Sequence, residues 1–95
     1  YVPYCTGDTH AGEVYTASEE TFNLYFSGRI NFDAILDDLK SSEGLDNATH
    51  VLLSGSSAGG VGTFLNADRG AAAFPNAVFK AAPIAGWFFP QVSYA

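Results

Sequence analysis

The residues whose types and spacing could do chemistry lie together in Gly55-Ser56-Ser57-Ala58-Gly59, which fits the pattern G-x-S-x-G. That pattern is typical of a nucleophile elbow, where a serine stands on a strained turn between a strand and a helix. The positions two before and two after the serine are crowded against the turn and must be small. The chemistry expected of Ser57 is attack on an acyl carbon, with the Ala58 N–H stabilising the oxyanion that develops.

Two other glycine-rich motifs fail because a required residue type is missing from each. A phosphate-binding P-loop would match Gly55 and Gly60, but Val61 stands where that motif requires lysine. A dinucleotide fingerprint would begin at Gly60, but Leu65 occupies its last glycine position. A Gly/Ser turn that only closes a strand–helix junction stays open as the non-catalytic alternative.

A serine hydroxyl needs a neighbouring base, and the sequence contains two histidines. His50 lies at the start of the strand that leads to Ser57, on the order of 15–20 Å away at the usual rise per residue. His10 falls in a loop at the same sheet edge as Ser57 if the strands are parallel. In α/β-hydrolases the acid and the histidine follow the serine in the chain, so His10 comes too early. We expect the base and its orienting acid to lie outside residues 1–95.

A strand and a helix must position Ser57. Residues 51–53 form a short apolar run typical of a buried parallel strand, and residues 61–69 mix small and apolar types as a packed helix does. Residues 78–84 are typical of a second buried strand. Glycines of the elbow and the next turn should let the helix approach the sheet closely: Gly59, Gly60 and Gly62.

The N-terminal half predicts a long loop followed by an amphipathic helix. Residues 1–5 are expected to end a strand, and residues 6–28 to form a loop with a short strand at 22–26. Loops of this length inside a domain are usually functional. Apolar residues at helical spacing then predict a helix that ends before Gly44: Phe32, Ile35, Leu36 and Leu39.

The order of these elements predicts an α/β fold with a parallel sheet. The sequence has no methionine, and neither of its ends carries the punctuation of a domain boundary. We therefore expect an internal piece of a longer protein. The expected fold is a partial α/β-hydrolase-like parallel sheet with flanking helices, an incomplete domain.

The composition excludes several classes of protein and of binding partner. The hydrophobic share of 47% with only 15% charged residues excludes a disordered tail. A formal net charge of −6 without a basic cluster argues against nucleic acid or an anionic membrane as partner. No apolar run is long enough to span a membrane. We expect neither a metal nor a cofactor, because acidic residues such as Asp8, Glu13 and Asp68 lack metal-ligand spacing and suit turn and helix caps.

Segments along most of the chain resemble the pectin acetylesterase/Notum family in order and approximate spacing. They are Val2-Pro3-Tyr4-Cys5, Leu24-Tyr25-Phe26-Ser27-Gly28, Gly55-Ser56-Ser57-Ala58-Gly59-Gly60, Asn66-Ala67-Asp68-Arg69 and Ala85-Gly86-Trp87-Phe88. The resemblance implies a secreted carboxylesterase, with residues 1–95 as a central fragment of its hydrolase domain. It implies an ester substrate: O-acetylated polysaccharide such as pectin first, and a fatty-acylated protein second.

The resemblance also implies roles for single residues. Ser57 matches the family's nucleophile, and Ala58 matches the residue that gives one oxyanion-hole N–H. Phe88 matches an aromatic residue of the acyl pocket, with core packing as the alternative. His10 falls where Notum-like sequences tend to have an aromatic residue, so it is a second candidate for the pocket wall. The remaining oxyanion donors would precede Tyr1, and the acid and base would follow Ala95.

Two further positions carry expectations that suit a secreted protein. Cys5 is the single cysteine, and the resemblance implies a disulfide with a cysteine outside residues 1–95; a buried free thiol is the alternative. Asn47-Ala48-Thr49 is an N-glycosylation acceptor pattern at an expected loop. The competing functions are a non-catalytic binding module that keeps the elbow but has lost its base, and a purely structural piece of a sheet core.

Overall fold

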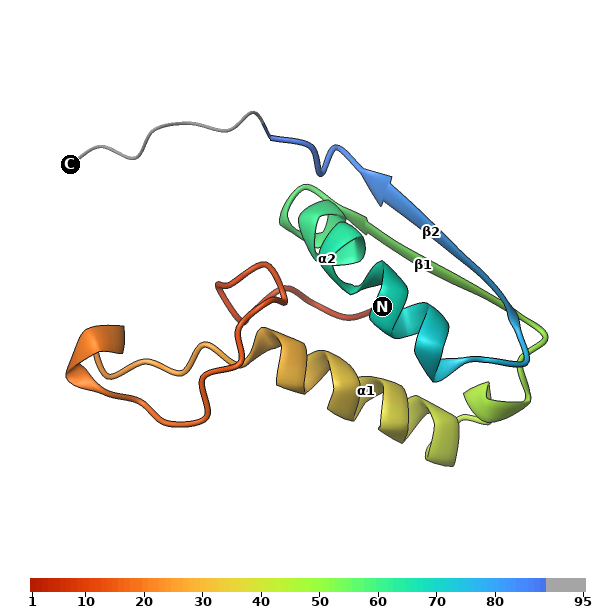
Figure 1. Ribbon diagram of the computed structural model, residues 1–95, viewed down its shortest axis with the longest axis horizontal. Coiled ribbons are helices and arrows are strands. Elements are labelled where there is room, and N and C mark those ends of the chain that lie inside the picture. The colour runs from red at the N-terminus through yellow and green to blue at the C-terminus, as the bar shows by residue number, and fades with distance from the viewer. Residues whose placement is uncertain (89–95) are drawn as a thin grey trace.

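The computed structural model describes residues 1–88, in which two helices and two parallel strands form the regular structure (Figure 1). Within these residues no helix is both long and apolar enough to cross a bilayer. The elements in chain order are the 3₁₀ turn η1 (Glu19–Thr21), α1 (Gly28–Ser42), the 3₁₀ turn η2 (Leu45–Asn47), β1 (His50–Ser56), α2 (Ala58–Ala73) and β2 (Val78–Ile84).

The two strands are parallel neighbours, as the sequence predicts, with α2 as the connection between them. Their register runs from His50 opposite Val78 to Ser56 opposite Ile84. Figure 1 shows α2 lying along both strands. Burial alternates along β1. The prediction that this strand is buried on both faces is therefore wrong for residues 1–88. Leu52 is 67% exposed on the face that α2 does not cover.

Helix α2 lies close to the sheet at both of its ends. At the start, a Cβ on Gly60 would come within 2.6 Å of the Ile84 carbonyl oxygen, which confirms the predicted close approach. At the end, the Phe74 ring stacks on the Phe79 ring with centroids 6.4 Å apart. Phe74 is the buried apolar residue that forms the core of residues 1–88.

Helix α1 is confirmed, and polar contacts hold it against α2. The Arg69 guanidinium donates two hydrogen bonds of 2.6 Å to the Asp33 carboxylate, and these bonds hold the pKa of Asp33 below its ordinary value. In the last turn of α1, the Lys40 ammonium donates to the Ala73 carbonyl and lies 4.7 Å from the Phe74 ring centroid. The two helices are therefore joined at two points along α1.

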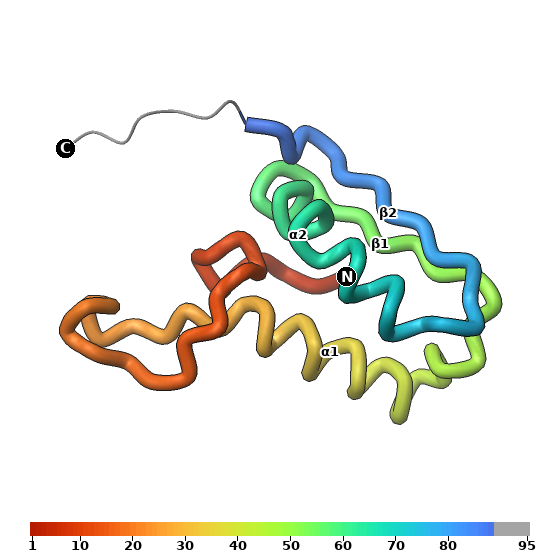
Figure 2. Tube along the Cα trace, in the orientation of Figure 1, coloured from red at the N-terminus to blue at the C-terminus, as the bar shows by residue number. Residues whose placement is uncertain are grey.

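The two strands expected in the N-terminal half are wrong. Residues 1–5 have no neighbouring strand to pair with in the described part of the chain, and Tyr1 is fully exposed. Phe22 and Asn23 have φ of 54° and 57°, which is left-handed backbone and not extended strand. Figure 2 shows the first residues running between α1 and α2, with the loop that follows projecting away from the sheet.

Candidate active site

Ser57 stands on a corner between β1 and α2. Its φ of 55° and ψ of −116° separate the extended backbone of Ser56 from the helical backbone of Ala58, and its side chain is exposed. A residue other than glycine rarely adopts positive φ, and such strain persists only where the surroundings enforce it. The strained strand-to-helix turn that the sequence predicts is therefore present at this position.

Backbone hydrogen bonds on both sides enforce this corner. The Ser57 N–H donates to the Ile84 carbonyl at the end of β2, over 3.0 Å. The Ser57 carbonyl accepts from the Val61 N–H, also over 3.0 Å, as the first bond of α2. The side chain of Ser57 makes no capping hydrogen bond to the helix. The corner is held by backbone groups, so the hydroxyl is not needed for it.

The start of α2 presents N–H groups beside the Ser57 hydroxyl. The first N–H groups of a helix have no partner within the helix and carry its positive dipole end. Ala58 is the first residue of α2, and no side chain of the described residues caps this end. Its N–H therefore suits the stabilisation of negative charge on an oxygen next to Ser57.

The glycines around the corner differ in how crowded they are. A Cβ on Gly55 would lie 2.3 Å from the Gly59 carbonyl oxygen, so Gly55 must lack a side chain. A Cβ on Gly59 would meet nothing within 4 Å, so the prediction that this position is crowded is wrong. Gly59 contributes backbone that approaches Gly55, and its own side-chain direction faces open space.

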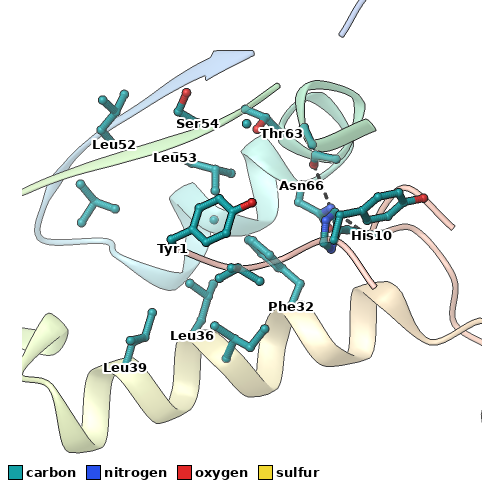
Figure 3. A pocket seen from close by; sticks show the side chains of 18 of the residues that line it. Tyr1, His10, Phe32, Leu36, Leu39, Leu52, Leu53, Ser54, Thr63 and Asn66 are labelled. Carbon is teal, nitrogen blue, oxygen red and sulfur yellow. Dashed lines mark hydrogen bonds between the residues drawn. The ribbon is translucent and has the colours of Figure 1, made fainter. Parts of the chain in front are cut away.

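His10 lies next to α2. Its imidazole packs against Gly62, whose Cβ would come 2.8 Å from His10 Cδ2, and against the Tyr4 ring at 5.2 Å between centroids. Gly62 therefore allows the loop at Thr9 and His10 to approach α2 closely. The prediction that Gly62 lets the helix approach the sheet is wrong. His10 and Ser57 both line a cavity of about 730 Å³ among α1, α2 and β1. Figure 3 shows His10 at this cavity. His50 begins β1, at the opposite end of that strand from Ser57.

Asp8 organises the loop that carries His10. Its carboxylate accepts hydrogen bonds from the Thr6 hydroxyl and from the N–H groups of His10, Gly12 and Gly28. Burial raises the pKa of Asp8, but these donors together outweigh that effect and leave the pKa below its ordinary value. The predicted capping role is confirmed, because the Gly28 N–H opens α1. Residues 1–88 contain no group of three or more His, Cys, Asp or Glu side chains that could hold a metal ion.

The remaining candidate residues lie apart from the corner. Phe88 is 61% exposed and is not among the residues lining the cavity, so both the pocket role and the core-packing alternative stay predictions for the longer protein. Cys5 is exposed in residues 1–88, and its disulfide stays a prediction. Asn47 is exposed at the end of η2, where the acceptor pattern was expected.

One polar residue in this region was missed as a contributor to the site. Asn66 of α2 is completely buried and binds the His10 carbonyl. Apart from its place in the family-like segment Asn66-Ala67-Asp68-Arg69, its signal in the sequence is a polar residue among the small and apolar residues of the helix. Such a position indicates a buried side chain with a specific hydrogen-bond partner.

The model of the pectinacetylesterase family matches residues 1–95. Palmitoleoyl-protein carboxylesterase NOTUM of Schmidtea mediterranea is 41% identical over 69 residues, which cover 73% of this chain and 12% of that protein. Pectin acetylesterase 11 of Arabidopsis thaliana is 35% identical over 88 residues, covering 92% and 22%. Palmitoleoyl-protein carboxylesterase NOTUM of Homo sapiens is 33% identical over 100 residues, covering 99% and 19%.

The chain thus spans only between 12% and 22% of the length of these relatives. The stretch that matches includes the corner at Ser57, both strands and both helices.

Proposed function

The chain belongs to the pectinacetylesterase family, and from that premise we propose that it carries the nucleophile of a carboxylic-ester hydrolase. The names of its relatives describe hydrolysis of two different carboxylic esters, one on a pectin and one on a protein. The observation that carries the proposal is the strained corner at Ser57, whose exposed hydroxyl lies beside the N-terminus of α2.

The proposed reaction has two steps. The Ser57 oxygen attacks the ester carbonyl carbon while a general base takes the hydroxyl proton, and the Ala58 N–H faces the oxyanion. The carbon–oxygen bond to the alcohol then breaks, and the alcohol leaves with the proton from the base. Water attacks the acyl-enzyme in the same way, which releases the carboxylic acid and restores Ser57.

The base and its orienting acid come, in this proposal, from outside residues 1–95. His50 lies at the wrong end of β1, and His10 precedes the serine in a chain order that α/β-hydrolases do not use. Residues 1–95 would then be the central part of a longer hydrolase domain, consistent with the small share of its relatives that the chain spans. The same proposal places the protein outside the cell, with Cys5 paired to a cysteine elsewhere and Asn47 open to glycosylation.

We propose an O-acetylated polysaccharide as the first substrate class and an acylated protein as the second. Relatives of both kinds share this stretch of chain, so it carries the chemistry common to both. His10 and Phe88 are the proposed pocket residues that would distinguish the acyl groups. Hydrolysis rates for aryl acetate and for long-chain aryl esters, measured on the full-length protein, separate the two classes.

A fluorophosphonate probe tests the nucleophile directly. In the full-length protein, mass spectrometry is expected to find the label on Ser57, and Ser57→Ala should lose both the label and the turnover of aryl acetate. Ser56→Ala is the matched control, since Ser56 is also exposed but belongs to β1. A label on any other residue, or an unlabelled folded protein, would contradict the proposal and favour a non-catalytic binding module.

A further inference from the structure

Asn66 is a fully buried polar side chain in α2, where the other buried residues are glycines and Thr63. It is 0% exposed, and burial of an amide is costly unless its groups are hydrogen-bonded. Its Nδ2 donates to the His10 carbonyl and to the Gly62 carbonyl, each over 2.9 Å (Figure 3). Both neighbours are carbonyl oxygens, so only the NH₂ of the amide can face them. The orientation of the Asn66 side chain is thereby fixed.

This orientation leaves the other end of the amide without a partner. Asn66 Oδ1 is buried and accepts no hydrogen bond in the described part of the chain. An unsatisfied buried acceptor costs about 1–3 kcal/mol. The two bonds donated by Nδ2 must offset this cost, and the Asn66 amide is therefore held firmly in one orientation.

The loop that Asn66 binds does not hold its shape by local preference. Thr9 and His10 are consecutive residues with φ of 55° and 57°, a conformation that each non-glycine residue adopts only at a cost. Asp8 holds this loop from the side of α1, through the N–H groups of His10 and Gly28. Asn66 holds it from the side of α2. The loop is therefore clamped between the two helices.

The clamp determines where the His10 imidazole lies relative to Ser57. The imidazole rests on α2 at Gly62, and Ser57 precedes the first residue of the same helix. Both residues line the same cavity. The same helix thus follows the corner and carries the amide that holds the His10 loop, so Asn66 links the position of His10 to the element that begins at Ser57.

We propose that Asn66 is a positioning residue for the ester hydrolysis, which holds His10 as a fixed wall of the cavity that Ser57 also lines. This inference rests on the proposed role of Ser57. Asn66 itself does not touch the substrate. A wall that contacts bound substrate and transition state equally affects KM, whereas the attack by Ser57 sets kcat.

Two substitutions in the full-length protein test this role. Asn66→Ala leaves the His10 carbonyl without its donor, and we expect KM for aryl acetate to rise about tenfold while kcat stays within about twofold. Gly62→Ala places a Cβ 2.8 Å from His10 Cδ2 and moves the imidazole without removing either Asn66 bond. Gly62→Ala should raise KM in the same way. We expect this variant to fold, because alanine favours a helix over glycine, so it provides the test if Asn66→Ala does not fold.

A His10→Ala background separates positioning from a merely structural role. If Asn66 acts through the imidazole, adding Asn66→Ala to His10→Ala should change kcat/KM less than about twofold, whereas independent effects multiply. Multiplied effects, or a fall in kcat with KM unchanged, would overturn the inference. Labelling of Ser57 distinguishes the two proposals. If the wild-type protein is not labelled, Ser57 is not the nucleophile and the positioning role of Asn66 falls with it. If Asn66→Ala and Gly62→Ala keep the label and an unchanged KM, only the role of Asn66 is refuted.

Discussion

Replacement of Gly55 by alanine tests the geometry of the corner at its tightest point. The new Cβ would lie 2.3 Å from the Gly59 carbonyl oxygen and 2.5 Å from the Gly59 carbonyl carbon. Ordinary contact begins at 3.4 Å, so the backbone of Gly59 must retreat by about 1 Å. Both obstructing atoms belong to the main chain at the start of α2, and they cannot move aside by a change of rotamer.

The expected cost follows from that obstruction. Forcing one extra methyl group into a packed site typically costs about 1–3 kcal/mol, because the surrounding backbone must shift. The shift falls on the first turn of α2, next to the Ala58 N–H that we propose for the oxyanion. We therefore expect Gly55→Ala to lower the free energy of unfolding by about 1–3 kcal/mol, and to slow labelling of Ser57 by at least about tenfold.

Gly59→Ala is the matched control, because both glycines belong to the same five-residue motif. Its Cβ would meet nothing within 4 Å. Alanine also favours a helix by up to about 1 kcal/mol over glycine. We expect unchanged or slightly raised stability, measured by denaturant unfolding, and a labelling rate of Ser57 within about threefold of wild type. Equal damage from the two substitutions, or a harmless Gly55→Ala, would refute this account of the corner.

Two further predictions concern the corner and the loop beside it. Ser57→Gly should unfold with a free energy at least about 1 kcal/mol higher than Ser57→Ala, because glycine accepts φ of 55° without strain; equal values in denaturant unfolding would contradict this. Asp8→Ala should lower stability by about 0.5–2 kcal/mol at pH 7, because the Gly28 N–H at the start of α1 loses its acceptor. The pKa of Asp8 is lowered by folding, so its contribution is present above the unfolded value of 3.8 and is lost as pH falls through the lower folded value. The difference between wild type and Asp8→Ala should stay constant above about pH 5 and shrink on further acidification; a difference that grows in acid would contradict the assignment.

The second half of the fold could be predicted because its signals are local. The apolar run before Ser57 and the small residues after it indicate a strand and a helix, and the glycine pattern marks the corner between them. Periodic apolar residues gave α1 for the same reason. These patterns do not indicate how many elements cover a strand. The sequence therefore predicts more burial of β1 than the structure shows in residues 1–88.

The first half depends on contacts between distant residues. The loop around Asp8 is held by a bond to Gly28, twenty residues further along, and by Asn66, which is 56 residues from His10. No local pattern specifies such pairs. The side chain of Asn66 was missed for the same reason, since an asparagine within a helix is ordinary until its partner is known.

The segment that follows β2 meets the start of α2 backbone to backbone. A Cβ on Gly60 would lie 2.8 Å from the Gly86 Cα, and a Cβ on Gly86 would lie 2.3 Å from the Gly60 carbonyl carbon. In most packed pairs a larger residue at one position can be accommodated by a smaller one opposite. Here neither partner has a side chain to shorten, so no second substitution can rescue the first. In a mutant library of this protein, we expect the folded variants to keep glycine at both Gly60 and Gly86, because no substitution at one position can relieve the clash created at the other.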